Sequence, residues 1–144
     1  MAEPRSLQAR RRRRATSPRL CYDAAVADVF TRPLDAKGKE IDLTPIQDLL
    51  ERLLRVWRPA QLWLFGSRAR GDGYARSDWD LFVVVPDDLP EVEIDPLRAW
   101  QLRKASRANA DVIACHASEF LDARNTPNTM AYEVTHGGVL LYER

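Results

Sequence analysis

Two aspartates separated by one residue, Asp78 and Asp80, are the side chains of this sequence best suited to metal chemistry. They open an apolar run, residues 81–85, whose length and composition are typical of a buried strand. Because side chains alternate along a strand, both carboxylates point to one face and Trp79 points to the other. Two like charges this close destabilise each other unless a cation lies between them, and oxygen-only ligands suit Mg²⁺. The pair therefore predicts a magnesium site at the start of a strand.

A glycine-bearing loop separates this strand from an earlier apolar run, residues 62–65, which also reads as a buried strand. Gly66 lets backbone N–H groups approach an anion, and the Ser67 hydroxyl adds a donor. A short helical turn is expected here, and its N-terminus also favours a phosphate. Arg68 and Arg70 follow, and guanidinium matches phosphate bidentately, but only one of them needs to face it. Phosphate contact and a plain surface position stay open for each arginine. The loop is expected to hold a triphosphate.

The spacing of these groups carries a resemblance. Gly-Ser, ten residues, and then Asp-x-Asp, continued as Asp-Trp-Asp-Leu-Phe-Val-Val over residues 78–84, resembles the minimal nucleotidyltransferase (MNT) family of the DNA polymerase β superfamily. The resemblance covers roughly Ile41 to Glu143. It implies an α/β (α+β) nucleotidyltransferase fold, with a small mixed β-sheet flanked by helices. It also implies ATP as substrate and two Mg²⁺ ions.

A third acidic residue, Asp111, opens a short apolar run at residues 111–115. If this strand pairs beside residues 81–85, Asp111 lies near the first two carboxylates. In the resembled family an aspartate on a neighbouring strand completes a triad, and the resemblance implies this role for Asp111, with a plain strand-edge aspartate as the alternative. The expected catalytic and metal-binding residues are Asp78, Asp80 and Asp111, and the expected nucleotide-binding residues are Gly66, Ser67, Arg68 and Arg70.

The acceptor of the nucleotide is suggested only by the resemblance. Small proteins similar to this one are often antitoxins encoded beside a HEPN-domain ribonuclease toxin, and they transfer AMP from ATP to a tyrosine of that partner. The resemblance therefore implies a protein adenylyltransferase with a HEPN toxin as its partner. Two alternatives stay open: nucleotide transfer to a small hydroxylated molecule such as an aminoglycoside, and a non-catalytic module that binds a toxin or nucleic acid.

Two helices are predicted around the loop and strands. Thr44 is expected to cap a helix, with a proline at its first position and a capping-box glutamine. Apolar residues then recur at helical spacing as far as Trp57. The helix should end there, because Pro59 disfavours helical geometry at the residue before it. Asp95 is expected to cap a second helix that begins at Pro96.

The C-terminal part predicts two further helices and a strand. Ser118 is expected to cap a short helix that ends at Ala123, and Asn128 a helix that ends at Gly137. Residues 139–142 read as a last strand. His116 and His136 have no metal-ligand partner at a useful spacing, so structural or surface roles are expected for both.

The formal charge of +1 hides an asymmetry. Residues 1–22 hold seven arginines and one glutamate and carry +6, whereas the remainder carries −5. This composition predicts a disordered basic tail over residues 1–22 attached to a mildly acidic domain, and the resemblance implies that residues 41–144 are a minimal nucleotidyltransferase domain. The run Arg10–Arg14 is compatible with nonspecific binding of nucleic acid. A solvated tail, or translated sequence upstream of the real start codon, is the favoured interpretation.

Composition also bears on the cellular compartment. The two cysteines, Cys21 and Cys115, lie far apart and outside any zinc-ligand spacing. No apolar run approaches the roughly 18 residues of a membrane span, and the N-terminus lacks the apolar segment of a secretory signal. We therefore expect a cytoplasmic protein without membrane contact.

Overall fold

The computed structural model describes Phe30 and residues 33–144. In this part of the chain four strands form one sheet in the order β3-β2-β1-β4. β1 pairs antiparallel with both β2 and β4, and β2 pairs parallel with β3. The strands are β1 (Gln61–Phe65), β2 (Trp79–Val85), β3 (Ala110–His116) and β4 (Val139–Glu143). The mixed sheet confirms the predicted α/β (α+β) fold class, whereas the predicted tail over residues 1–22 lies outside the described residues.

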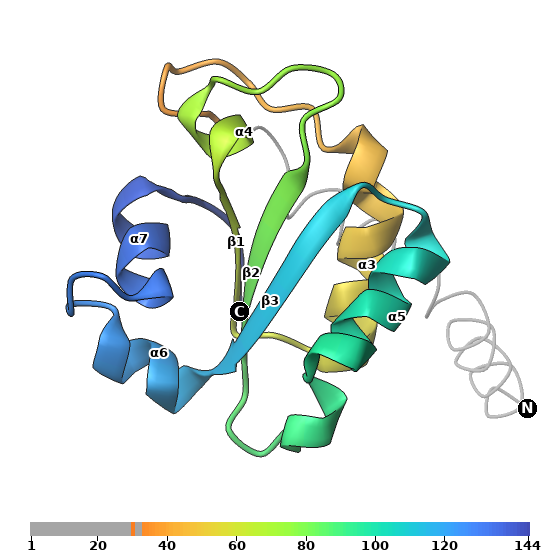
Figure 1. Ribbon diagram of the computed structural model, residues 1–144, viewed down its shortest axis with the longest axis vertical. Helices are drawn as coiled ribbons and strands as arrows, with labels where there is room; N and C mark the ends of the chain where they lie inside the picture. The colour runs from red at the N-terminus through yellow and green to blue at the C-terminus, as the bar shows by residue number, and fades with distance from the viewer. Residues whose placement is uncertain (1–29, 31–32) are drawn as a thin grey trace, which may run out of the picture. The chain divides into compact units, whose positions relative to one another are not determined.

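Helices cover both faces of the sheet (Figure 1). α3 (Gln47–Trp57) and α5 (Pro96–Ser106) lie on one face, and α6 (Ala117–Ala123) and α7 (Met130–Gly137) lie on the other. The short helix α4 (Ser67–Arg70) follows β1 as expected, and two 3₁₀ turns, η1 (Thr44–Ile46) and η2 (Glu91–Glu93), precede α3 and α5. None of these helices, in the residues that the structure describes, is long and apolar enough to cross a membrane.

The central strand β2 is buried on both faces, as predicted. Phe82 and Val84 pack with Phe120 of α6 and Val134 of α7, whereas Leu81, Val83 and Val85 alternate toward the opposite face. In β1 only Leu62 and Leu64 are fully buried. Trp63 and Phe65 point to the other face, where they pack against the core of α6 and α7 but are only partly covered. The expectation that β1 is buried on both faces was therefore wrong.

The helix ends follow local chemistry, with one exception in the first pair. α5 begins as predicted, because Asp95 Oδ1 accepts a hydrogen bond from the Arg98 N–H at 2.8 Å. α3 ends at Trp57 as predicted, and Arg58 takes a left-handed conformation with φ 44°. Thr44 does not cap α3, because it opens η1 and its own N–H donates to Asp42 Oδ1 at 3.0 Å.

Both predicted caps of the C-terminal helices were wrong. α6 begins at Ala117, so Ser118 lies inside it, and the Ser118 N–H donates to Asp87 Oδ1 at 2.9 Å. α7 is capped by Thr129, whose hydroxyl accepts from the Tyr132 N–H at 3.2 Å. Asn128 has φ 67°, a left-handed conformation that asparagine tolerates but that differs from the extended geometry of a cap.

Candidate active site

The three predicted aspartates lie at one end of the sheet. In the parallel pairing of β2 with β3, Asp80 is the register partner of Asp111, and Trp79 is the partner of Ala110. Register partners on neighbouring strands share a face, so Asp80 and Asp111 point the same way. Asp78 stands directly before β2, and Trp79 is buried on the opposite face with 3% of its surface exposed. The fold therefore brings together side chains that are 33 positions apart in sequence.

The charges of these aspartates act on one another. The pKa of Asp80 is raised above its usual value, first by partial burial and then by the negative charges of Asp111 and Asp78, while Arg70 opposes the shift. A cation would relieve this repulsion, and carboxylate oxygens are the donors that Mg²⁺ prefers. Among the described residues, the three aspartates do not form a group whose ligand atoms all lie within 4.8 Å of one another.

Gly66 touches the central carboxylate. Its φ is 77°, and a Cβ built on it would lie 2.2 Å from Asp80 Oδ2. The preceding residue, Phe65, is the antiparallel register partner of Asp80, which explains the closeness. A side chain at position 66 would therefore displace Asp80, so glycine is required there for both conformation and space.

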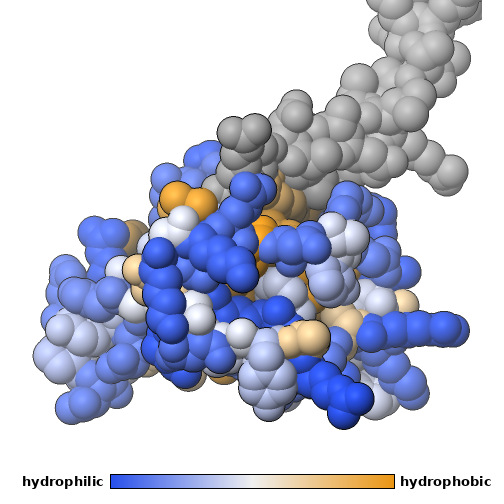
Figure 2. Space-filling model, turned by 90° about the horizontal axis from the view of Figure 1, so that it is seen from above, coloured by the Kyte–Doolittle hydropathy of each residue, from blue (hydrophilic) through white to orange (hydrophobic). Residues whose placement is uncertain are grey.

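The loop between β1 and β2 walls a cavity of about 520 Å³. Figure 2 shows this end of the molecule, where hydrophilic side chains dominate the visible surface. The cavity is lined by Gly66, Ser67, Arg70, Asp72, Tyr74, Arg76, Ser77, Asp78 and Asp80. Asp111 instead lines a separate cavity of about 180 Å³ with Trp100 and Arg103 of α5. Ser67, Arg70 and two of the aspartates thus line one cavity, and the third aspartate lines another.

The two arginines of α4 have different surroundings. Arg68 donates to the carbonyl oxygens of Ala75 and Ser77, at 3.3 and 2.8 Å, and its guanidinium carbon lies 4.0 Å from the centre of the Trp79 ring. It does not line the 520 Å³ cavity. Arg70 lines that cavity and pairs with Asp72 at 3.3 Å. Arg68 therefore holds the loop in shape, whereas Arg70 is placed to meet an anion.

Asn109 is a site residue that the sequence analysis missed. Its side-chain amide donates to Asp78 Oδ1 at 2.8 Å, and its backbone carbonyl oxygen accepts from the Trp79 backbone N–H at 3.0 Å. Asn109 therefore orients the first aspartate from the neighbouring strand end. No motif marks it, because its partner lies 31 positions upstream.

Comparison with known families decides the class of protein. The family described as "Polymerase beta, Nucleotidyltransferase" matches residues 46–144, which is more than half of the chain and includes all seven predicted site residues. The chain belongs to this family. The superfamily predicted from the sequence is confirmed, and this nucleotidyltransferase carries its three aspartates at the β2 and β3 end described above.

Solved structures similar to this nucleotidyltransferase include three at low identity. A toxin–antitoxin with AMP-PNP is 23% identical, with a TM-score of 0.46 over 67% of this chain and 72% of that chain. A putative nucleotidyltransferase from Sulfolobus solfataricus is 22% identical, with a TM-score of 0.48 over 71% and 80%. A tri-AMPylated Shewanella oneidensis HEPN toxin in complex with MNT antitoxin is 18% identical, with a TM-score of 0.41 over 67% and 71%. A comparison with curated proteins gave no match.

Proposed function

We propose that this nucleotidyltransferase uses ATP and Mg²⁺ to transfer AMP to a tyrosine hydroxyl of a HEPN-type toxin, and that it thereby acts as an antitoxin. The observation that carries the transferase part is the register of Asp80 with Asp111 beside the Gly66 loop. The tyrosine acceptor and the HEPN partner rest on the resemblance of residues 66–84 to the minimal nucleotidyltransferases.

The roles of the acidic side chains follow from their positions. Asp78, Asp80 and Asp111 supply the oxygen ligands for divalent ions, and the raised pKa of Asp80 supports a cation between them. Bound Mg²⁺ supplies charge neutralisation to the polyphosphate as negative charge shifts toward the leaving group. Asn109 keeps Asp78 in place through its amide. The chain itself contributes mainly positioning, as phosphoryl and nucleotidyl transfer require.

The phosphate chain of ATP is assigned to the 520 Å³ cavity. Gly66, Ser67 and Arg70 line it, and a serine hydroxyl, backbone N–H groups and a guanidinium are donors that suit phosphate oxygens. Arg68 supports this loop from behind through Ala75 and Ser77. The nucleotide therefore enters on the side of Asp78 and Asp80 that α4 borders.

The acceptor is assigned to the Asp111 carboxylate, on the sheet face that it shares with Asp80. There the acceptor hydroxyl gives its proton to the Asp111 carboxylate, its oxygen bonds to the α-phosphorus, and the bond from that phosphorus to pyrophosphate breaks. Asp111 is exposed and lines the 180 Å³ cavity, so it is accessible to a second substrate.

Transfer of label from α-labelled ATP tests this proposal. A HEPN-type protein serves as acceptor, with Mg²⁺ present. We expect label on a tyrosine of that protein, and a loss of at least ~10²-fold in rate for Asp80→Asn. Asp122→Asn, which removes an exposed carboxylate on α6, is the matched control and should keep full activity. Full transfer by Asp80→Asn would refute the catalytic assignment, and label on an aminoglycoside but not on protein would refute the acceptor.

A further inference from the structure

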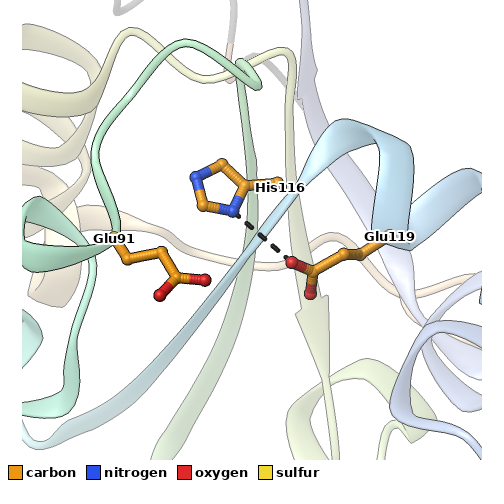
Figure 3. A group of neighbouring side chains, drawn as sticks. All are labelled: Glu91, His116 and Glu119. Atoms are coloured by element: carbon orange, nitrogen blue, oxygen red, sulfur yellow. Dashed lines mark ion pairs between the residues drawn. The ribbon is translucent and has the colours of Figure 1, made fainter.

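A second group of metal-type ligands lies at the other end of the sheet. β3 begins beside Asp111 and ends at His116, which pairs with Val85, so about 16 Å of strand separates the two ends. His116 meets Glu91 of η2 and Glu119 of α6, as Figure 3 shows with one glutamate on each side of the ring. Three chain segments therefore converge on one histidine, away from the nucleotide loop.

The hydrogen bonds of His116 define the state of its ring. Its side chain is only 12% exposed, and Nε2 lies 2.7 Å from the Leu89 carbonyl oxygen. A carbonyl oxygen can only accept, so Nε2 carries the hydrogen, and in the neutral ring Nδ1 presents a lone pair. Nδ1 lies 3.5 Å from Glu119 Oε1. A histidine that ligates a metal through one nitrogen usually donates from the other to a carbonyl or carboxylate, which is the arrangement here.

The distances fit an ion with little rearrangement. One ligand atom from each of Glu91, His116 and Glu119 lies within 4.8 Å of the other two. Around an ion with bonds of about 2.0–2.2 Å in tetrahedral geometry, ligand atoms lie about 3.4 Å apart, so a movement of roughly 1 Å closes the group. Both glutamates are exposed, and their side chains can make that movement without disturbing the core.

The charges also favour a cation. Within the described part of the chain, Glu119 has His116 as its ion-pair partner, and Glu91 has none. Asp87 adds a third negative charge near the ring, since it contributes to the raised pKa of His116 after the Leu89 carbonyl and Glu119. Lysine and arginine make no ion pair with either glutamate among these residues. The local charge is therefore uncompensated when the imidazole is neutral.

We propose that Glu91, His116 and Glu119 bind a Zn²⁺-type ion at a second metal site, independent of the aspartates. One imidazole nitrogen and two carboxylates form a ligand set that zinc accepts with a fourth position left to water, whereas Mg²⁺ prefers oxygen alone. The ion joins η2, on the connection from β2 to α5, to the start of α6. Its role is to stabilise this end of the sheet.

Zn²⁺ titration of the full-length chain, followed by calorimetry and by melting temperature, tests the site. Millimolar Mg²⁺ is present throughout to occupy the aspartates. We expect one Zn²⁺ per chain and a rise in melting temperature that Mg²⁺ alone does not produce. Absence of Zn²⁺ binding by the wild-type chain would overturn the proposal and leave an ordinary ion pair between His116 and Glu119.

Four variants assign the bound ion. Glu91→Gln and Glu119→Gln should each weaken Zn²⁺ binding at least ~10-fold, because even outer partners of metal ligands cost 10–100-fold. His116→Ala should abolish Zn²⁺ binding. If loss of the hydrogen bond to the Leu89 carbonyl oxygen unfolds this variant, the two glutamate variants still test the site, because both glutamates are exposed. Asp122→Asn, on the same helix as Glu119, should bind Zn²⁺ like the wild type. Unchanged affinity in both glutamate variants would refute the site.

The aspartate variant separates this proposal from the proposed function. Asp80→Asn should lose nucleotide transfer but keep its Zn²⁺ affinity. Glu91→Gln should keep nucleotide transfer but bind Zn²⁺ more weakly. Loss of Zn²⁺ from Asp80→Asn would place the ion at the aspartates and overturn the second site.

Discussion

Gly66 and Asp80 lie so close together that the Asp80 carboxylate leaves no room for a side chain at position 66. A Cβ at position 66 would lie 2.2 Å from Asp80 Oδ2 and 3.1 Å from its Cγ. The carboxylate that occupies the middle of the aspartate group is therefore positioned by the absence of a side chain on the neighbouring strand end. Loop conformation and metal ligand are coupled through this contact.

Gly66→Ala should consequently lose activity as well as stability. Position 66 has φ 77° and ψ −156°, a conformation that is almost restricted to glycine and costs other residues about 1–3 kcal/mol before the clash with Asp80 is counted. Gly38→Ala is the matched control, because Gly38 has φ 80° and no atom within 4 Å of its added Cβ. We expect both variants to lower the free energy of urea unfolding, but only Gly66→Ala to lose nucleotide transfer. Equal activity in the two variants would show that the contact with Asp80 has no catalytic consequence.

Asp80→Asn should stabilise the metal-free protein while it abolishes transfer. The folded-state pKa of Asp80 is raised above 3.8 by burial and by the neighbouring aspartates, so the folded state favours the protonated form. This favourable contribution is complete below the unfolded-state pKa and is lost as pH rises through the folded-state pKa. Melting temperatures in chelator should therefore be higher for Asp80→Asn at pH 7, and the difference should vanish below about pH 3.8. Addition of Mg²⁺ should raise the wild-type value and leave the variant unchanged; a stabilised wild type in chelator would contradict this.

Substitution of Arg68 should mainly lower stability, whereas substitution of Arg70 should mainly weaken nucleotide binding. Arg68→Gln removes charged hydrogen bonds to the Ala75 and Ser77 carbonyls, each worth about 1.5–3 kcal/mol, and the stacking on Trp79. We expect a clear loss of unfolding free energy. Arg70→Gln breaks only an exposed pair with Asp72, so it should change the free energy of unfolding little, but it removes a cation from the cavity. Its main effect should be a higher KM for ATP. A higher KM in Arg68→Gln together with a loss of unfolding free energy in Arg70→Gln would show that Arg68 binds the nucleotide and Arg70 stabilises the loop.

Asn109→Ala should reduce activity through Asp78. The amide at 2.8 Å holds one oxygen of that carboxylate, and loss of such a partner of a metal ligand typically costs 10–100-fold. The rate should recover in part at higher Mg²⁺, which a merely structural role would not explain. Asn125→Ala, an exposed asparagine after α6, serves as control. An Mg²⁺ dependence identical to that of the wild type would exclude the positioning role.

Much of the candidate site could be read from local patterns. Asp78 and Asp80 before an apolar run already predicted two carboxylates at a strand start, and β2 begins at Trp79, between them. Gly66 and Ser67, at the start of α4, were identified in the same way. Helix caps were less predictable, because backbone conformation as well as residue type decides which side chain accepts from which N–H group. Asp42 accepts from the Thr44 N–H, and Thr129 accepts from the Tyr132 N–H.

The sequence by itself determined the local features of this nucleotidyltransferase: which residues form strands, which loop connects β1 and β2, and which pair of carboxylates lies at the start of β2. Tertiary structure alone decided that Asp111 pairs with Asp80, that Arg68 turns to the loop and that Asn109 reaches Asp78. It also decided that Glu91 approaches His116 across 25 positions. The reason is physical: alternation and helical periodicity act between near neighbours, whereas strand pairing joins distant segments through backbone hydrogen bonds that carry no signature in residue spacing.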